Sequence, residues 1–300
     1  MDGVLVLDKP AGLTSHDVVA VARRCTRELR IGHTGTLDPL ATGVLPLACG
    51  RATRLIRFLT SSEKDYDAEV RFGLTTDTFD VMGEETSRSG SIPSRAEIER
   101  AVEALRGEYL QMPPPFSAKK IAGERAYAMA RRREPITLTP VPVRVTRANV
   151  LGIDGATARI ELTCSAGFYV RAFAHRLGEI AATGACLAAL RRTRSGDFDL
   201  RQAITVDQLQ HPGGEWRDAL MPLERLLPTF PATTLTAEGR QRVSHGQDVL
   251  DAHVQSHSGL AGRDEPRPEW VRLLDNEGNL LAMATAGKNG GSLHPAVVLI

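Results

Sequence analysis

Residues 64–73, KDYDAEVRFG, alternate polar and apolar side chains with a period of two. One row is charged throughout, whereas the other is apolar and begins with Tyr66. Successive side chains of a strand point to opposite faces, so this period predicts a half-buried strand. Tyr66 lies on the inward row, where it is either a plain core aromatic or a ring placed to stack on a base.

Other segments predict further strands and helices. Residues 3–7 form a short apolar run, and residues 141–150 and 156–164 predict an antiparallel pair around the turn LGIDG. Thr14 and Asp17 fit a capping box at the start of a helix, and another amphipathic helix is expected at residues 94–106. After residues 228–231 the sequence changes to short strands joined by glycine-containing turns, which predicts a domain boundary there.

The composition is that of a globular protein with about two domains. Of its 300 residues, 42% are hydrophobic and 24% are charged. No apolar run approaches the roughly 18–20 residues of a membrane-spanning helix, and the N-terminal segment lacks a signal pattern, so we expect a cytoplasmic protein. Its four cysteines form no CxxC motif, so we expect neither a zinc site nor disulfides.

The charge is unevenly distributed along the chain. The formal net charge is only +1. Nine basic and three acidic residues lie between Arg106 and Arg147, whereas residues 231–300 carry six basic and eight acidic ones. A confined basic patch favours a nucleic-acid footprint on part of the surface.

Residues 32–43, GHTGTLDPLATG, set one carboxylate, Asp38, among glycines and threonines directly before the apolar VLPLACG. Such an acid is a helix cap, a buried structural group or a reactive group. Pro39 biases Asp38 toward an extended or turn conformation, and the glycines allow a large flat substrate to approach the backbone. We therefore expect a carboxylate presented on a rigid turn.

Arg171, in the segment GFYVRA, is expected at the first helical turn after a strand. A buried guanidinium near Asp38 would keep the acid ionised and would orient it. The sequence contains no HExxH, EF-hand, GxGxxG or P-loop motif, and His253 and His257 are interpreted as loop histidines rather than zinc ligands. We expect chemistry by side chains alone, without a metal or cofactor.

Six segments resemble, in this order, those of bacterial tRNA pseudouridine-55 synthases: GVLVLDKPAGLTSHDVV, GHTGTLDPLATGVLPLACGRATR, KDYDAEVRFG, PPPFSAKKIAGERAYAMAR, GFYVRAFAHRLG and LRRTRSGDF. The resemblance covers residues 3–200 and implies an α+β fold. A catalytic domain, residues 1–229, would be built on a mixed, largely antiparallel sheet flanked by helices, with a basic insertion at about 108–147. The tail, residues 230–300, resembles a small PUA-type β-barrel that binds RNA.

The resemblance implies a tRNA-modifying isomerase without a cofactor. The T-loop uridine would be flipped out, its N1–C1′ bond broken, the uracil rotated and C5 joined to C1′. Asp38 would be the nucleophile, Tyr66 would stack on the base and accept the C5 proton, and Arg171 would be the partner of Asp38. It stays open whether Asp38 attacks C1′, adds to C6 or removes a sugar proton.

Further RNA contacts are expected from the same motifs. His33 matches a histidine linked to base flipping, and Leu190 matches a residue that lines the uracil pocket. The remaining expected contacts are Gly32, Thr34, Lys9, Lys119, Arg131 and Arg132. The expected partner is the T arm of tRNA, bound by a monomer. Phe168 and Ala172 depart from the threonine and hydroxyl residue usual at these positions of the family.

Two other functions compete with the isomerase. One is a non-catalytic RNA-binding or tRNA-folding protein on the same scaffold, and the other is an aspartyl-nucleophile hydrolase. The presence of Asp38, Tyr66 and Arg171 together disfavours a pure binder, because such a protein needs no carboxylate in the path of an anionic ligand. The hydrolase lacks the second carboxylate that its chemistry normally uses.

Overall fold

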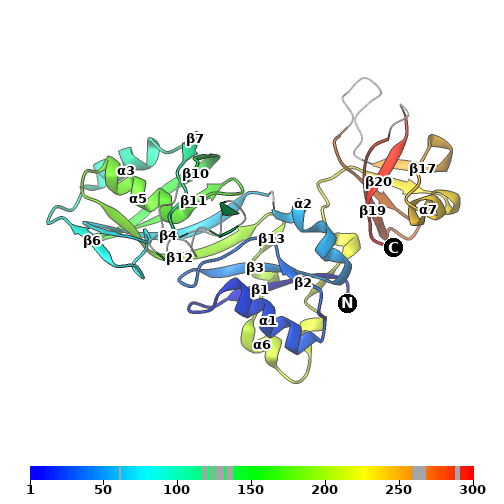
Figure 1. Cartoon of the computed structure of the whole chain (residues 1–300), viewed down its shortest axis with the longest axis horizontal. Helices are drawn as coiled ribbons and strands as arrows, with labels where there is room; N and C mark the ends of the chain where they lie inside the picture. Colours follow the sequence, from blue (N-terminus) through cyan, green and yellow to red (C-terminus); the bar gives the residue numbers. More distant parts are fainter. Residues whose placement is uncertain are drawn as a thin grey trace.

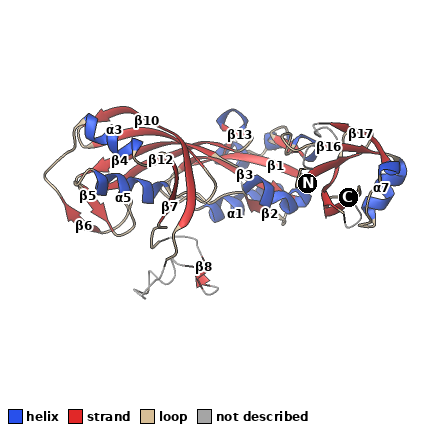
Figure 2. Cartoon of the chain, turned by 90° about the horizontal axis from the view of Figure 1, so that it is seen from above, coloured by secondary structure: helices blue, strands red, loops and turns tan. Residues whose placement is uncertain are grey.

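A computed structural model of the chain describes all residues except 61, 117–119, 122–123, 126–131, 133–137, 259–267 and 288–290. Figures 1 and 2 show an elongated molecule in which a large sheet and a smaller C-terminal one follow each other along the long axis. Within the described part of the chain, no helix is long and apolar enough to cross a membrane.

The larger sheet has the order β14-β1-β3-β12-β4-β11-β10-β7, with β15, β2 and β13 paired beside β1, β3 and β12. Its strand pairs are antiparallel apart from β1–β14 and β3–β12, which are parallel. The prediction of a mixed, largely antiparallel sheet is therefore confirmed. The strands are β1 (Gly3–Lys9), β2 (Ile31–His33), β3 (Thr42–Cys49), β4 (Lys64–Phe72), β7 (Gly107–Gln111), β10 (Val141–Asp154), β11 (Thr157–Cys164), β12 (Ala185–Ser195), β13 (Phe198–Asp199), β14 (Ile204–Thr205) and β15 (Leu220–Pro222).

The alternating segment forms β4, near the middle of this sheet between β12 and β11. Its inward row, from Lys64 through Tyr66 to Phe72, is buried, whereas Glu69 and Arg71 are exposed. The predicted antiparallel pair is also present, with Val150 of β10 opposite Ile160 of β11. Both predictions are confirmed, the first from a period of two and the second from two strand segments joined by the turn LGIDG.

Helices cover one face of the larger sheet. Both predicted helix starts are confirmed, because Thr14 and Asp17 form a capping box, as do Ser94 and Glu97. One hydrophobic core joins α1, α3, α5 and α6 to this face of the sheet. Figure 1 shows α3 and α5 together at one end of the sheet, and α1 with α6 nearer the N terminus. The described α-helices are α1 (Ser15–Thr26), α2 (Ile56–Thr60), α3 (Arg95–Glu103), α5 (Val170–Ile180), α6 (Val206–Gln210) and α7 (Ala237–Ser244).

A second sheet is made entirely of residues after 231. Its order is β17-β16-β18-β19-β20, and α7 packs beside it. His253 lies in a 3-10 turn and His257 in β17, so the interpretation as loop histidines was wrong. Whether residues 230–300 are a PUA-like domain stays a prediction.

The strands of the second sheet are β16 (Ala232–Leu235), β17 (Val254–Ser258), β18 (Val271–Leu274), β19 (Leu280–Ala286) and β20 (Leu293–Val298). Two short hairpins complete the described strands, β5 (Leu74–Thr76) with β6 (Glu85–Arg88) and β8 (Lys120–Ile121) with β9 (Glu124–Arg125).

The two sheets are joined through the 3-10 helix η1 (Gly50–Leu55) and α2. A second core packs Val4 and Val6 of β1 with Phe58 of α2 and with Leu280 and Met283 of β19. Side chains three residues apart eclipse in a 3-10 helix, so Arg51 and Arg54 share one side. Arg51 and Arg54 donate hydrogen bonds to the carbonyl oxygens of Leu299 and Val298. These two arginines of η1 therefore fix the last residues of the chain through backbone hydrogen bonds.

We predict that Phe58→Ala lowers the free energy of unfolding by about 3–5 kcal/mol, since truncating a buried aromatic leaves a cavity. The Phe58 ring is 6% exposed and packs edge-on against Phe230 and Trp270, at centroid distances of 5.9 and 4.8 Å. Urea denaturation followed by tryptophan fluorescence measures the change. Arg57, whose guanidinium lies 4.4 Å from the centroid of the Trp270 ring, provides the control. Arg57→Ala should cost less than about 1 kcal/mol, and an equal loss for both variants would contradict the prediction.

Candidate active site

The turn that presents Asp38 is held in place by the first residue of α1 and by the segment before this helix. The Oγ of Ser15 accepts a hydrogen bond from the Leu37 amide at 2.8 Å and lies 3.1 Å from the Leu37 carbonyl oxygen, to which it can donate. The Gly12 amide donates to the Pro39 carbonyl at 2.8 Å. Leu37 is buried, and Asp38, the next residue, is partly exposed. Two of the sequence motifs thus form one rigid unit.

Lys9 stabilises the backbone of the segment that holds the Asp38 turn. Its side chain is fully buried, and its Nζ donates to the carbonyl oxygens of Pro10 at 2.8 Å and Leu13 at 2.6 Å. Burial lowers the pKa of Lys9 to about 8, although the Asp38 carboxylate opposes this shift. Its place is therefore structural, since a fully buried ammonium cannot contact an RNA phosphate directly.

The glycine that closes the turn is required by strand packing. Gly43 has a φ of +99°, and a Cβ there would lie 2.2 Å from the carbonyl oxygen of Arg192. This close approach allows β3 and β12 to pair in parallel, with Gly43 opposite Arg192. Gly35 differs, because a Cβ there would meet only ordinary contacts, the nearest to the Arg192 side chain at 3.5 Å.

Arg171 and Asp38 meet in a two-point ion pair. The Arg171 Nε lies 2.8 Å from Oδ2 of Asp38, and its Nη2 lies 3.2 Å from Oδ1. The Arg171 side chain is 7% exposed, whereas that of Asp38 is 40% exposed. A carboxylate that is fixed by a shielded partner and still faces outward is oriented to react with a bound molecule.

Two backbone carbonyl oxygens accept further hydrogen bonds from the Arg171 guanidinium, and a second carboxylate forms a longer ion pair with it. Nη1 donates to the Thr78 carbonyl at 2.9 Å, and Nη2 donates to the Phe116 carbonyl at 2.8 Å. The Oδ2 of Asp80 lies 3.6 Å from Nε. Asp80 could not be found from the sequence, because its segment TTDTFD has no recognisable spacing, and only the fold brings this loop to α5.

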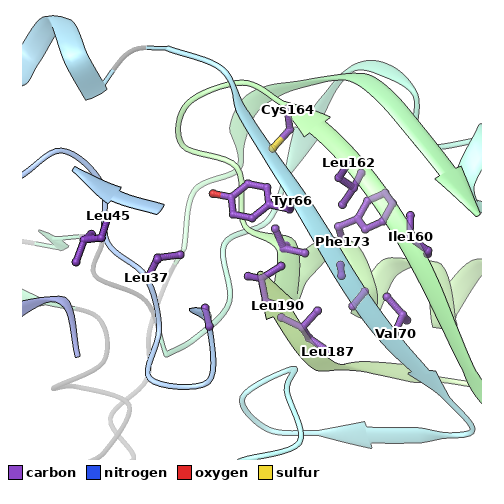
Figure 3. Close-up of a cluster of buried hydrophobic side chains, with 14 of the residues drawn as sticks. Leu37, Leu45, Tyr66, Val70, Ile160, Leu162, Cys164, Phe173, Leu187 and Leu190 are labelled. Atoms are coloured by element: carbon purple, nitrogen blue, oxygen red, sulfur yellow. The ribbon is translucent and has the colours of Figure 1, made fainter. Parts of the chain in front are cut away.

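Tyr66 projects from β4 into a mainly apolar cluster with Leu37 and Leu190 (Figure 3). Leu190 lies on the neighbouring strand β12, opposite Ala68. The Tyr66 hydroxyl points toward the side of the cluster where Leu37 lies. Burial raises the pKa of Tyr66 to about 12, although the charge of Arg192 opposes the shift. Its phenol is therefore neutral at physiological pH.

Two buried cations that were not predicted as site residues lie next to Tyr66, one on the neighbouring strand β12 and one on the same row of β4. Arg192 is 1% exposed and donates to the carbonyl oxygens of Val44 at 2.7 Å and Gly35 at 3.1 Å. Lys64 is 6% exposed and donates to the carbonyl oxygens of Thr60 and Ser62. Burial lowers the pKa of Lys64 to about 8, and the charge of Arg192 adds to this shift. The alternation of β12, with apolar Leu190 and then Arg192 on the inward row, was the available signal for Arg192.

The remaining predicted contacts lie in two places. Gly32 and His33 end strand β2, where the His33 ring packs edge-on against His16 at 5.4 Å, and the buried Thr34 follows. Arg132 is exposed, whereas Lys119 and Arg131 lie outside the described residues. The two departures from the family pattern are apolar contacts, because Phe168 packs against Phe173 and Ala172 is buried.

The arrangement can act by nucleophilic or general-base chemistry at one carboxylate beside a flat, neutral aromatic ring. Among the described residues, no three His, Cys, Asp or Glu side chains gather as metal ligands. Four buried cations lie around the site, Lys9, Lys64, Arg171 and Arg192, whereas the carboxylates that contact Arg171 are those of Asp38 and Asp80. This surplus of positive charge suits an anionic ligand.

Comparison with protein families gives two matches that together span most of the chain. Residues 23–170 match the TruB family pseudouridylate synthase (N terminal domain). Residues 171–228 match the tRNA pseudouridylate synthase B C-terminal domain.

Curated relatives and solved structures agree with these matches. A tRNA pseudouridine synthase B of Solibacter usitatus is 42% identical over 302 residues, with 100% of both chains covered. One of Mycobacteroides abscessus is 44% identical, with 92% of this chain and 93% of the relative covered. Two solved structures each give a TM-score of 0.74 and cover 99% of this chain and 85% of the other. They are an H/ACA ribonucleoprotein bound to a substrate RNA containing 2'-deoxyuridine, at 25% identity, and a Cbf5-Nop10-Gar1 complex, at 27%.

We predict that Tyr66 remains a neutral phenol at pH 10, where an ordinary tyrosine is about half ionised. The reason is that burial raises the pKa of Tyr66 to about 12. NMR of protein labelled with ¹³C at the tyrosine Cζ reports the ionisation state, and the signal missing in Tyr66→Phe identifies the residue. A Cζ shift of Tyr66 that titrates near pH 10 would show that the ring is not desolvated as described.

Proposed function

The chain belongs to the TruB family of pseudouridylate synthases, and we propose that it isomerises the T-loop uridine at position 55 of tRNA through the Asp38 carboxylate. Its activity is the conversion of a tRNA uridine to pseudouridine, so it is an isomerase. The observation that carries the proposed mechanism is the two-point pair of an outward-facing Asp38 with a shielded Arg171.

The isomerisation needs no other reactant. The N1–C1′ bond of uridine breaks and a C5–C1′ bond forms, while the hydrogen on C5 leaves as a proton and N1 takes up a proton. Asp38 can attack C1′, add to C6 or remove a sugar proton, and each route requires an ionised carboxylate held in one orientation. Arg171 supplies that orientation through two hydrogen bonds.

Tyr66 is proposed to stack on the flipped uracil. Flipping a base out of its stack costs a few kcal/mol of free energy. Stacking of the flipped base on an aromatic ring offsets about 1–3 kcal/mol of this cost. The neutral phenol of Tyr66, with its pKa raised to about 12 by burial, is a weak base. Stacking therefore suits Tyr66 better than accepting the C5 proton, and Leu190 of the same apolar cluster would line the other side of the base.

RNA contacts outside the pocket are proposed for two regions. His33, with Gly32 and Thr34 beside it, lies on the strand that leads into the Asp38 turn, where it would take the place of the flipped base. Lys119, Arg131 and Arg132 belong to the basic segment and would contact phosphates of the T arm. The residues 230–300 would add a PUA-like RNA-binding domain.

The protein is proposed to act as a monomer in the cytoplasm. In support, Asp38, Tyr66 and Arg171 come together within a single chain, so no second copy is needed to complete the site. A non-catalytic RNA-binding protein is not favoured, because the relatives with full coverage are named as synthases.

We predict that Asp38→Asn binds tRNA normally but loses turnover by at least about 10³-fold, because the reacting carboxylate is replaced by an amide. Tritium release from tRNA labelled at uridine C5 measures turnover, and filter binding measures affinity. Asp67→Asn is the matched control, since Asp67 is a β4 carboxylate paired with Arg159. Near-native tritium release by Asp38→Asn would remove Asp38 as the reacting group.

We predict that replacing Arg131, Arg132 and Arg133 together with glutamine weakens tRNA binding and flattens its salt dependence. Each phosphate contact adds roughly 0.7–0.9 to the slope of log K against log salt, so three contacts should lower it by about 2–3. Titrations between low and moderate salt measure the slope. Replacing the ion-paired surface arginines Arg88, Arg95 and Arg201 is the control. An equal slope for the basic-segment variant and native protein would contradict a phosphate contact there.

A further inference from the structure

The loop between β5 and β6 positions one side of the Arg171 guanidinium. The Thr78 carbonyl accepts from Nη1 at 2.9 Å, and Oδ2 of Asp80 lies 3.6 Å from Nε. Phe79 lies between these two residues. The backbone conformation of Phe79 therefore decides whether Thr78 and Asp80 both face Arg171.

Phe79 adopts an unfavourable backbone conformation. Its φ is +65°, in the left-handed region that a bulky aromatic residue seldom occupies. Such a conformation persists only where the surroundings determine it, and it is common at functional sites. The backbone gives part of the support, because the Phe79 carbonyl accepts from the Leu187 amide at 3.0 Å and the Val81 amide donates to the Leu187 carbonyl at 2.9 Å.

The ring of Phe79 is held by a residue of α5. It stacks on the His175 ring with a centroid distance of 3.9 Å and an angle of 8° between the planes. His175 follows Arg171 by four residues on the same helix, so the two side chains lie on one helix face. One face of α5 therefore carries both the Arg171 guanidinium and the His175 ring. The ring contacts Phe79, in the same loop whose Thr78 carbonyl accepts a hydrogen bond from Arg171.

His175 has little other bonding to explain its position. Its Nδ1 is buried without a hydrogen-bond partner among the described residues, and its Nε2 lies 3.8 Å from the exposed Glu179. Burial lowers the pKa of His175, so its ring is neutral at physiological pH. Both rings also line a cavity of about 440 Å³, so close packing on every side does not force them together.

We infer that His175 is a positioning residue: its ring holds Phe79 in the left-handed conformation and thereby keeps Thr78 and Asp80 directed at Arg171, which aligns Asp38. This inference rests on the proposed roles of Asp38 and Arg171 in uridine isomerisation. Its chemical requirement is a flat ring at position 175, and a titratable nitrogen is not required.

The test compares single-turnover rates and tRNA affinities of native protein, His175→Leu and His175→Phe. A small misplacement of a reacting group costs up to about 10²-fold in rate, so His175→Leu should be about 10–100-fold slower with its tRNA affinity within twofold of native. His175→Phe restores a flat ring and should stay within threefold of the native rate. The inference is overturned if His175→Leu keeps the native rate, or if His175→Phe is as slow as His175→Leu.

Two further variants separate the ring contact from other effects. Phe79→Leu removes the same stack from the loop side, and the double variant with His175→Leu should be no slower than the slower single variant, because both remove one contact. Multiplying effects would overturn the inference. Glu179→Gln should keep the native rate, and a loss equal to that of His175→Leu would assign the effect to the ion pair instead.

A variant that does not fold and a native protein that lacks the proposed activity give results that can be told apart. If His175→Leu does not fold, Phe79→Leu decides: a tenfold slower rate with native affinity supports the inference, and a native rate overturns it. If native protein releases no tritium from C5-labelled tRNA, the proposed function itself fails. If native protein turns over and the stacking variants match it, only the role of His175 fails.

Discussion

The ion pair between Asp38 and Arg171 is the contact on which the rest of the site depends. A buried guanidinium is costly unless its donors are satisfied, and Arg171 is satisfied by groups from three separate segments of the chain. These are the Asp38 turn, the loop of Thr78 and Asp80, and the carbonyl of Phe116. Loss of one partner would leave a buried charge incompletely paired, so each segment constrains the positions of the others. The carboxylate that emerges from this network is fixed before any RNA binds.

The sheet supplies the second requirement, which is a rigid support for the Asp38 turn. Gly43 lets β3 lie against β12 closely enough to pair in parallel, and Arg192 crosses this junction to reach carbonyl oxygens on both sides of the turn. Lys9 completes the support from the β1 side. The buried cations Lys9 and Arg192 place positive charge close to the partly exposed Asp38 carboxylate. This charge lowers the electrostatic repulsion between Asp38 and an approaching polyanion such as RNA. Packing and electrostatics are therefore served by the same side chains.

Much of the local structure could be predicted because it is encoded over short distances. The period of two in β4, the capping boxes of α1 and α3, and the β10–β11 pair each follow from a few adjacent residues. The arginines of η1 show the limit of such patterns. Their spacing of three is equally compatible with a solvated or phosphate-binding face, but Arg51 and Arg54 bind carbonyl oxygens at the end of the chain. His257 shows the same limit, since the strand that contains it depends on pairing with β16.

The sequence by itself determined the order of the motifs, the single carboxylate on a turn, the inward tyrosine and the family to which these residues are matched. Tertiary structure alone decided that Asp80 stands beside Arg171, that Lys9 is buried, and that Phe79 stacks on His175. The physical reason is the range of the interactions. Periodicity, capping and turn preferences act within a few residues, whereas the partner of a buried charge is selected by contacts between segments that lie far apart in the chain. The pairing of Asp38 with Arg171 could be predicted from the sequence only because both lie in recognisable motifs. The residues that hold this pair in place, such as Asp80 and Lys9, could not be assigned from a sequence pattern.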